Sequence, residues 1–285
     1  MATTVPDLMP TVDLGPHRVS RLIVGSNPFS GNSHVSAALS AEMRDFHSNQ
    51  RLLESLARCE KWGITAFQSR GDSHTIRLYN EHRLAGGRLR WIVQTASEIT
   101  DLRANVSQIV RAGAVAIYLH GTRTDALWSQ GRFNEVPHCL RVIREAGVLV
   151  GLGTHIPDVV AYAEEHAWDL DFYMACLYNL SRVERDSALV SGAPPPEEQF
   201  IHSDRDAMCA AIRATPKPVL AFKILAASRL SRSQDDLEGA FRYAFANIKP
   251  SDAVVVGMFC KYGDQVGQNA RLALRYGRLA GAPVG

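Results

Sequence analysis

The sequence predicts an α/β protein with the fold of a (β/α)₈ TIM barrel, and three observations support this prediction. The chain has 285 residues, which is the usual size of one such barrel. Eight short apolar segments alternate with longer amphipathic segments along the chain. Each apolar segment is bounded by glycine or polar residues, as strands of a parallel sheet are. We therefore expect residues 1–285 to form a single barrel domain.

The eight predicted strands are runs of mostly apolar residues, the pattern of strands that are buried on both faces. In chain order they are residues 21–25, 64–68, 90–94, 114–120, 148–153, 171–175, 218–223 and 252–257. An open, doubly wound sheet is the alternative arrangement. The glycine-rich dinucleotide-binding fingerprint of that fold does not follow the first predicted strand, which favours the barrel.

The segments between the strands have the apolar spacing of amphipathic helices. In residues 50–63 this spacing places Leu52, Leu53 and Leu56 on one face. Asp101 is the predicted N-cap of a helix that continues to residue 113. The same pattern recurs in residues 156–167, 203–214, 234–245 and 263–277.

Two predicted connections are longer than most loops in compact domains. They are residues 27–48, after the first strand, and residues 177–200, after the sixth strand. Both leave the carboxyl ends of strands, where barrel enzymes carry their active sites. We therefore expect both connections to cover the active-site face.

The composition excludes several classes of protein as first choices. Hydrophobic residues make up 46% and charged residues 21% of the chain, as in ordinary globular proteins. A net charge of +2 does not indicate a nucleic acid or an anionic membrane as partner. No apolar run approaches the ~20 residues of a membrane span, and no secretory signal is recognisable. The five scattered cysteines, without a CxxC pair, indicate a reduced, cytoplasmic protein. Nothing in the sequence indicates an oligomeric state.

Histidines and an aspartate follow several of the predicted strands. His120 and His155 leave the fourth and fifth strands, whose ends are separated by roughly 5 Å of sheet spacing plus side-chain reach. Asp72 and His74 follow the second strand. These four side chains predict a divalent metal site or an acid–base cluster. The structural alternative is that each side chain satisfies a loop backbone group, or that His74 is exposed at the start of a helix.

Lys223 ends the otherwise apolar seventh strand. Burial makes a lysine amine easier to deprotonate, so that it can act as a base or a Schiff-base nucleophile. The structural alternative is an ion pair between Lys223 and either Asp72 or Glu98. The predicted catalytic residues are His120, His155, Lys223, Asp72 and Glu98. The predicted substrate-binding residues, polar or aromatic groups near strand ends, are Asn27, Arg70, Gln94, Tyr178 and Asn179.

Three stretches of the chain resemble the aldo/keto reductase superfamily. The first barrel strand of that superfamily resembles residues 19–31, VSRLIVGSNPFSG. Its fifth strand and following helix resemble residues 151–165, GLGTHIPDVVAYAEE. Its last strand and helix resemble residues 251–274, SDAVVVGMFCKYGDQVGQNARLAL. The resemblance implies a barrel and reduction with NADPH by an Asp, Tyr, Lys and His tetrad. His120 lies where the family histidine belongs. The second strand lacks the family aspartate, Gln94 stands where the lysine belongs, and Tyr79 lies too far along the chain to be the tyrosine.

The predicted function is therefore non-redox chemistry on a small polar substrate, sugar-like or carrying a carbonyl. A lyase, isomerase or hydrolase would use the strand-end groups for acid–base or metal-assisted catalysis. One alternative is an NAD(P)H-dependent reductase with an altered tetrad, and another is an inactive barrel that binds a ligand. The residues identify no cofactor, and they fit a divalent transition metal better than NADPH.

Overall fold

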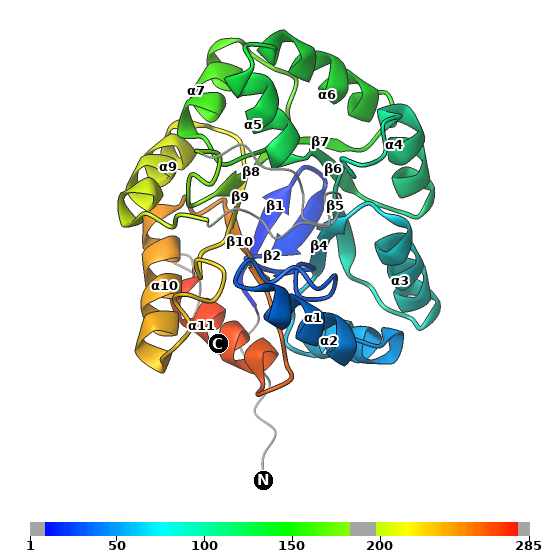
Figure 1. The fold of residues 1–285 in the computed structure, drawn as a ribbon, viewed down its shortest axis with the longest axis vertical. Coiled ribbons are helices and arrows are strands. Elements are labelled where there is room, and N and C mark those ends of the chain that lie inside the picture. Colours follow the sequence, from blue (N-terminus) through cyan, green and yellow to red (C-terminus); the bar gives the residue numbers. More distant parts are fainter. Residues whose placement is uncertain (1–8, 183–197, 279–285) are drawn as a thin grey trace.

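The computed structural model describes residues 9–182 and 198–278, and its centre is a closed barrel of parallel strands (Figure 1). The barrel strands are β3 (Leu22–Gly25), β4 (Ala66–Arg70), β5 (Arg90–Gln94), β6 (Ala116–Leu119), β7 (Leu149–Thr154), β8 (Phe172–Cys176), β9 (Val219–Phe222) and β10 (Ala253–Gly257). Each strand pairs in parallel with the next, and β10 pairs with β3 to close the barrel. All eight coincide with predicted strands, so the prediction of a TIM barrel is confirmed.

Strand side chains alternate between the barrel interior and the layer beneath the helices, as the two-residue repeat of a strand requires. On β4, Ala66 belongs to the interior cluster, whereas Phe67 belongs to the outer cluster beneath the helices. Tyr118 and Phe172 fill the interior from β6 and β8. The same alternation directs the last inward residue of each strand into the mouth of the barrel.

The helices form a ring around the barrel (Figure 1). They are α1 (Ala37–Phe46), α2 (Asn49–Lys61), α3 (Ser73–Leu84), α4 (Leu102–Arg111), α5 (Gly121–Ser129), α6 (Val136–Arg144), α7 (Pro157–Glu165), α9 (His202–Ala214), α10 (Gln234–Asn247) and α11 (Gln265–Tyr276), with a 3₁₀ turn at Phe133–Glu135. The predicted N-cap of α4 is confirmed, because the Asp101 carboxylate accepts a 3.0 Å hydrogen bond from the Ala104 amide.

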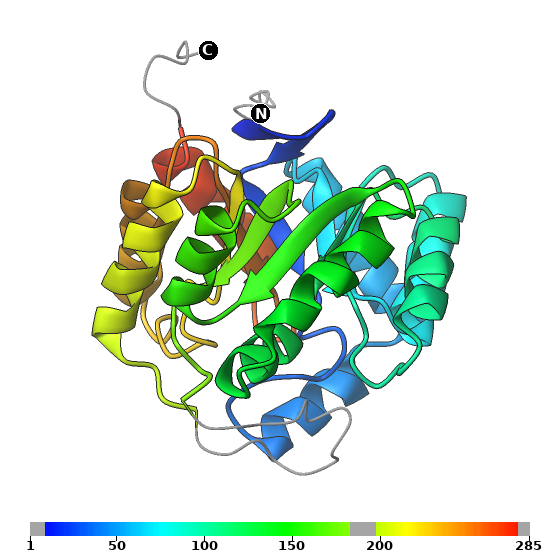
Figure 2. The same cartoon turned by 90° about the horizontal axis from the view of Figure 1, so that it is seen from above.

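An N-terminal hairpin closes one end of the barrel and was not predicted. Its strands, β1 (Thr11–Leu14) and β2 (His17–Ser20), pair in antiparallel fashion. Gly15 opens the two-residue turn with φ +56°, a backbone conformation that favours glycine. Leu14 and Val19 are buried in the same cluster as the barrel interior. Figure 2 shows the hairpin at the end of the barrel opposite α1, so the expected active-site face, at the carboxyl ends of the strands, is the other end.

The two long connections, which were expected to be loops, are described to different extents by the structure. The connection after β3 is partly helical, because α1 forms within it. The Ser36 hydroxyl caps α1 by accepting from the Leu39 amide, and Met43 buries its apolar face. Of the connection after β8, only residues 177–182 and 198–200 lie within the described residues. No helix in the described ranges is long and apolar enough to cross a membrane.

Candidate active site

Lys223 follows β9 and leaves the strand in a left-handed backbone conformation. Strand alternation would direct Phe222 into the barrel and the next side chain outward. Instead, Lys223 has φ +58°, and its side chain lines a cavity at the mouth of the barrel. The Lys223 side chain is only 8% exposed, and its Nζ lies 3.8 Å from Oε1 of Glu198, which is 4% exposed. Lys223 therefore lies at this strand end, as the sequence predicted, and its side chain is buried.

The cavity has a volume of about 320 Å³ and lies at the carboxyl ends of β3, β4, β9 and β10. Its lining combines polar and apolar side chains. Polar groups come from Asn27, His34, Gln68, Lys223 and Asn269, and apolar groups from Met43, Phe222, Leu225 and Phe259. Such a mixture, apolar walls with a few polar groups, is typical of small-molecule sites. Of the predicted site residues, Asn27 and Lys223 line this cavity.

A left-handed turn follows Lys223 at the edge of the cavity. Ala226, Ala227 and Ser228 have φ values of +48°, +50° and +71°. Left-handed backbone costs a residue with a Cβ roughly 1–2 kcal/mol. Ala227 and Ser228 both line the cavity. Strain of this kind persists where the surrounding structure holds it, and it often accompanies binding sites.

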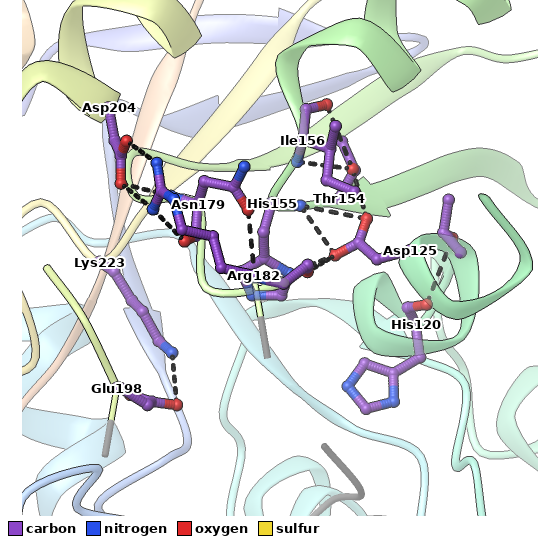
Figure 3. Close-up of polar contacts among 12 residues, drawn as sticks. His120, Asp125, Thr154, His155, Ile156, Asn179, Arg182, Glu198, Asp204 and Lys223 are labelled. Atoms are coloured by element: carbon purple, nitrogen blue, oxygen red, sulfur yellow. Dashed lines mark hydrogen bonds and ion pairs between the residues drawn. The ribbon is translucent and has the colours of Figure 1, made fainter. Parts of the chain in front are cut away.

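Glu198 and His34 link the two long connections beside Lys223. The Glu198 carboxylate lies 2.9 Å from Nδ1 of His34, and His34 Nε2 lies 3.3 Å from the Asn27 carboxamide nitrogen. Figure 3 shows the Lys223 amine directed toward Glu198. Sequence reasoning missed both residues. His34 and Glu198 are 164 positions apart, and no local pattern marks them as partners.

His155 is held by a buried carboxylate on α5. Its Nδ1 lies 2.7 Å from Oδ2 of Asp125, and its backbone amide donates to the same oxygen at 3.1 Å. The hydroxyls of Thr154 and Ser181 also donate to Asp125, each at 2.6 Å. Because an ionised carboxylate only accepts hydrogen bonds, Nδ1 of His155 carries the proton and Nε2 is the basic nitrogen. Asp125 was missed because its position within a helix gave no sign of its partner.

His120 and His155 come from neighbouring strands, β6 and β7, as the sequence predicted. His120 is the N-cap of α5, and its backbone amide donates to the Thr95 hydroxyl at 3.1 Å. The His155 ring packs against Gly121, the residue after His120. A Cβ on Gly121 would lie 3.3 Å from Cε1 of His155, so glycine allows this close approach. Figure 3 shows His155 between Lys223 and His120.

The two histidines belong to a different part of the mouth from the cavity. The residues that line the 320 Å³ cavity come mainly from the β3, β4, β9 and β10 side. Phe222 connects the two parts, because it lines the cavity and its ring packs edge-on to His155 with centroids 5.5 Å apart. The barrel mouth therefore presents Lys223 on one side of Phe222 and the histidine pair on the other.

Arg70, the last residue of β4, points into the mouth after the inward residues Ala66 and Gln68. It forms an ion pair with Glu98, and its Nε lies 3.6 Å from Asp72. Burial lowers the pKa of Arg70, and the Asp72 charge opposes this effect. The structural alternative, an ion pair between Lys223 and either Asp72 or Glu98, was therefore wrong. Asp72 and Glu98 pair with Arg70, whereas Lys223 faces Glu198.

The predicted metal set is not assembled. No group of three or more His, Cys, Asp or Glu side chains within residues 9–182 and 198–278 could hold a metal ion. The Asp72 carboxylate caps α3 by accepting from the Thr75 amide at 2.9 Å. His74 is exposed on the first turn of that helix. His155 uses Nδ1 for Asp125. The four predicted ligands therefore do not converge.

The remaining predicted substrate-binding residues have structural partners. The Gln68 amide donates to the Tyr118 hydroxyl at 2.7 Å, and that hydroxyl donates to Gln94 at 3.2 Å. Gln94 thus ends a hydrogen-bonded chain within the barrel, where burial raises the pKa of Tyr118. Tyr178 packs edge-on to Phe200 with ring centroids 5.0 Å apart, and burial raises the Tyr178 pKa.

Asn179 lies in the connection that follows β8. Its side-chain oxygen accepts from the Ser181 amide at 3.1 Å, which forms a local turn. Its backbone amide donates to Asp204, which also pairs with Arg182. These contacts hold the start of the connection against α9, so Asn179 contributes to loop structure at the mouth.

Comparison with known proteins supports the fold. No protein-family model matches the chain, and no curated protein matches it in sequence. Among solved structures, it resembles N-acetylmannosamine-6-phosphate 2-epimerase from Clostridium perfringens, with a TM-score of 0.50 and 15% identity over 83% of this chain and 85% of that one. It also resembles a truncated 3-deoxy-D-arabino-heptulosonate 7-phosphate synthase from Thermotoga maritima, with a TM-score of 0.54 and 11% identity over 94% and 90% of the two chains.

A third similar structure is the apo form of Gox0644, with a TM-score of 0.57 and 7% identity over 98% of this chain and 97% of that one. At such identities the likeness establishes the fold alone. The aldo/keto reductase resemblance of the sequence is not shown by these comparisons. The chain thus has the fold of a parallel eight-stranded TIM barrel.

Proposed function

We propose that this protein is a non-redox barrel enzyme of the lyase or isomerase type that acts on a small polar carbonyl compound. Lys223 is the group that reacts with the carbonyl. One observation carries this proposal: the Lys223 side chain is buried at a strand end yet lines a cavity large enough for a small metabolite. A lysine with a purely structural role would have little reason to reach a cavity through left-handed backbone.

The proposed chemistry begins when the neutral Lys223 amine adds to the substrate carbonyl carbon. The resulting carbinolamine takes up one proton at its hydroxyl, loses water and becomes an iminium ion. The iminium draws electrons from the adjacent carbon, so that a C–H or C–C bond at that carbon can break. A proton then moves to or from the carbon, and water releases the product and restores the amine. No electrons are gained or lost overall, which is consistent with a lyase or an isomerase.

The other predicted site residues have supporting roles in this proposal. Nε2 of His155 accepts or returns a proton of a substrate that extends from the cavity past Phe222, because Asp125 holds the opposite nitrogen of the ring. His120 shares this task from the neighbouring strand. Arg70 holds an anionic group of the substrate, with Asp72 and Glu98 keeping its guanidinium in place. Asn27 binds the substrate in the cavity.

Two observations favour non-redox chemistry over the reductase alternative. The Tyr79 hydroxyl donates to the Leu89 carbonyl at 2.9 Å, and Tyr79 belongs to the cluster between the barrel and the helices. It therefore lies away from the mouth, where a reductase would need its proton donor. The epimerase and the synthase that share this fold also carry the names of non-redox enzymes.

Borohydride trapping tests the proposal. The protein is incubated with glyceraldehyde, dihydroxyacetone or pyruvate in the presence of sodium cyanoborohydride, and modified peptides are identified by mass spectrometry. We expect a stable adduct on Lys223 that forms at least tenfold faster than on any other lysine. Lys223→Met, which keeps the length and apolar stem, should abolish it. The control Lys261→Met alters a lysine at 36% side-chain exposure and should leave the adduct unchanged.

The alternatives make different predictions in the same experiment. Uniform modification of surface lysines, with Lys223 unreacted, would refute the proposed role of Lys223. An inactive ligand-binding barrel would bind a carbonyl compound, as detected by calorimetry, but would neither form the adduct nor convert the compound.

A further inference from the structure

We propose that Glu198 is a catalytic residue that exchanges protons with the Lys223 amine, and that His34 is the positioning residue that holds Glu198 in place. This inference rests on the proposed function of Lys223. It adds two residues to the site, one from each of the two long connections. No sequence pattern identified either residue. The site is then assembled only where these connections meet the end of β9.

The geometry joins the three side chains through one oxygen atom. Oε1 of Glu198 lies 3.8 Å from Nζ of Lys223 and 2.9 Å from Nδ1 of His34. The His34 side chain is 15% exposed, so all three groups are largely withdrawn from water. Electrostatic interactions are stronger in such surroundings than at the surface. The 3.8 Å separation is an ion-pair distance longer than a hydrogen bond, so proton transfer requires the amine to approach the carboxylate or to use one bridging water.

The chemistry of imine formation requires a proton carrier at this place. An ammonium group has no lone pair, so Lys223 must lose a proton before it can attack. The Glu198 carboxylate takes this proton and becomes a carboxylic acid. After addition, the acid returns the proton to the carbinolamine hydroxyl, which leaves as water while the C=N bond forms. The sum is one carbonyl and one ammonium converted to one iminium and one water, with Glu198 unchanged.

His34 is fixed from both sides of its ring. The carboxylate of Glu198 accepts from Nδ1–H, and the Asn27 carboxamide donates to Nε2, a pattern that the neutral ring satisfies. The His34 backbone has φ +56°, and its carbonyl accepts from Arg229 at 3.2 Å. The Arg229 guanidinium also lies 4.2 Å from the centre of the Phe200 ring. His34 therefore fixes the direction of the Glu198 carboxylate.

Three charged or titratable groups surround Glu198 in the described structure. Lys223 and His34 face its carboxylate directly. Arg229 approaches from the connection after β9, through its contacts with Phe200 and the His34 carbonyl. Replacing Glu198 by glutamine removes the negative charge that favours the protonated Lys223 amine and keeps the size of the side chain.

The test measures how fast Lys223 is acetylated by a small N-hydroxysuccinimide ester at a series of pH values. Peptide mass spectrometry reports each lysine separately. In Glu198→Gln, the midpoint of the Lys223 profile should move to lower pH by at least one unit, which is a tenfold gain in rate below the midpoint. His34→Asn should move the midpoint in the same direction by less, because the Glu198 charge remains. Asparagine is chosen because it tolerates the left-handed backbone of His34.

Lys217 provides the matched control at the opposite end of β9. Its Nζ pairs with Glu164 at 2.9 Å, and both side chains are more exposed than the Lys223 pair. Glu164→Gln removes the carboxylate of this second pair and should leave the Lys223 profile in place. A change in the Lys223 rate by one factor at every pH, without a displaced midpoint, would show altered access only and would overturn the inference.

Imine formation with the carbonyl compound that labels Lys223 supplies the second readout. The wild type should form the adduct at least tenfold faster than Glu198→Gln. A displaced Lys223 midpoint without any wild-type adduct would show only that the Glu198 charge acts on Lys223, and it would refute both the proposed function and the catalytic role of Glu198. A wild-type adduct with an unmoved midpoint would refute the role of Glu198 and support that of Lys223.

Discussion

Asp125 and His155 form a buried hydrogen-bonded pair, with Oδ2 and Nδ1 separated by 2.7 Å and side chains 3% and 5% exposed. The carboxylate comes from α5 and the imidazole from the end of β7. Asp125 is also the acceptor for the Thr154 and Ser181 hydroxyls. One carboxylate thus connects helix α5, the end of β7 and the connection after β8. The orientation of the His155 ring depends on this charge.

Asp125→Asn should change the protonated nitrogen of His155 and destabilise the protein. The amide nitrogen is a donor, so at least one of the groups that now donate to Asp125 loses its acceptor. We expect a loss of about 1–3 kcal/mol in the free energy of unfolding, measured in urea. Long-range ¹H–¹⁵N spectra should show Nδ1–H in the wild type and a substantial Nε2–H population in the variant. Asp158→Asn, an exposed position, should change stability by about 0.5 kcal/mol or less. An unchanged tautomer would contradict the orienting role of Asp125.

Ser228→Gly should stabilise the protein. Ser228 has φ +71° and is exposed, so its side chain adds little packing. Removing the Cβ relieves a left-handed strain of about 1–2 kcal/mol, partly offset by the greater freedom of glycine in the unfolded chain. We expect a gain of about 0.5–1 kcal/mol in urea unfolding. Ser228→Ala keeps the Cβ and should show no gain. Equal effects of both substitutions would mean that the backbone conformation is not the cause.

Leu14→Ala tests whether the N-terminal hairpin contributes to the stability of the barrel. Leu14 is 1% exposed and packs in the interior cluster. Removing a buried leucine side chain leaves a cavity and costs about 2–5 kcal/mol. Leu84 is 88% exposed, so Leu84→Ala should change the free energy of unfolding by about 0.5 kcal/mol or less. Similar losses for both variants would show that the hairpin does not plug the barrel.

The barrel could be predicted from the sequence because its strands are buried on both faces. Most read as nearly continuous apolar runs, and this signal is local. The N-terminal hairpin gave a weaker signal. Its strands, Thr11–Leu14 and His17–Ser20, are short, and some of their side chains remain exposed. Their role depends on contact with the interior of a barrel that is formed by the rest of the chain.

The site could be predicted only in part, because side-chain partners are non-local. Lys223 and the neighbouring histidines follow from strand order alone. Asp125, His34 and Glu198 could not be predicted, since their contacts are with distant residues. Asp125 contacts His155, 30 positions away, and His34 contacts Glu198, 164 positions away. The four predicted metal ligands do not converge, because proximity to a strand end does not determine the direction of a side chain. Asp72 faces the helix that it caps.

The pH dependence of stability tests the environment of His82. Burial lowers the pKa of His82 below its ordinary value of 6.5, and Glu60, 3.8 Å away, opposes this effect. The unfolded chain therefore binds a proton near pH 6 more readily than the folded protein does. Unfolding should become easier as the pH falls below 6.5, with a contribution of at most about 1.4 kcal/mol per pH unit from this group. Above pH 6.5 the contribution is fully present.

Urea unfolding at pH 7.5 and pH 5.5 measures this effect. His82→Gln cannot titrate, so it should lose less stability between the two pH values than the wild type does. His166→Gln replaces an exposed histidine and should retain the wild-type pH dependence. The ring of His82 lies where a Cβ on Gly87 would be, so some overall destabilisation of His82→Gln is expected. The test is therefore the difference between the two pH values, and an unchanged difference would place the pH dependence on other groups.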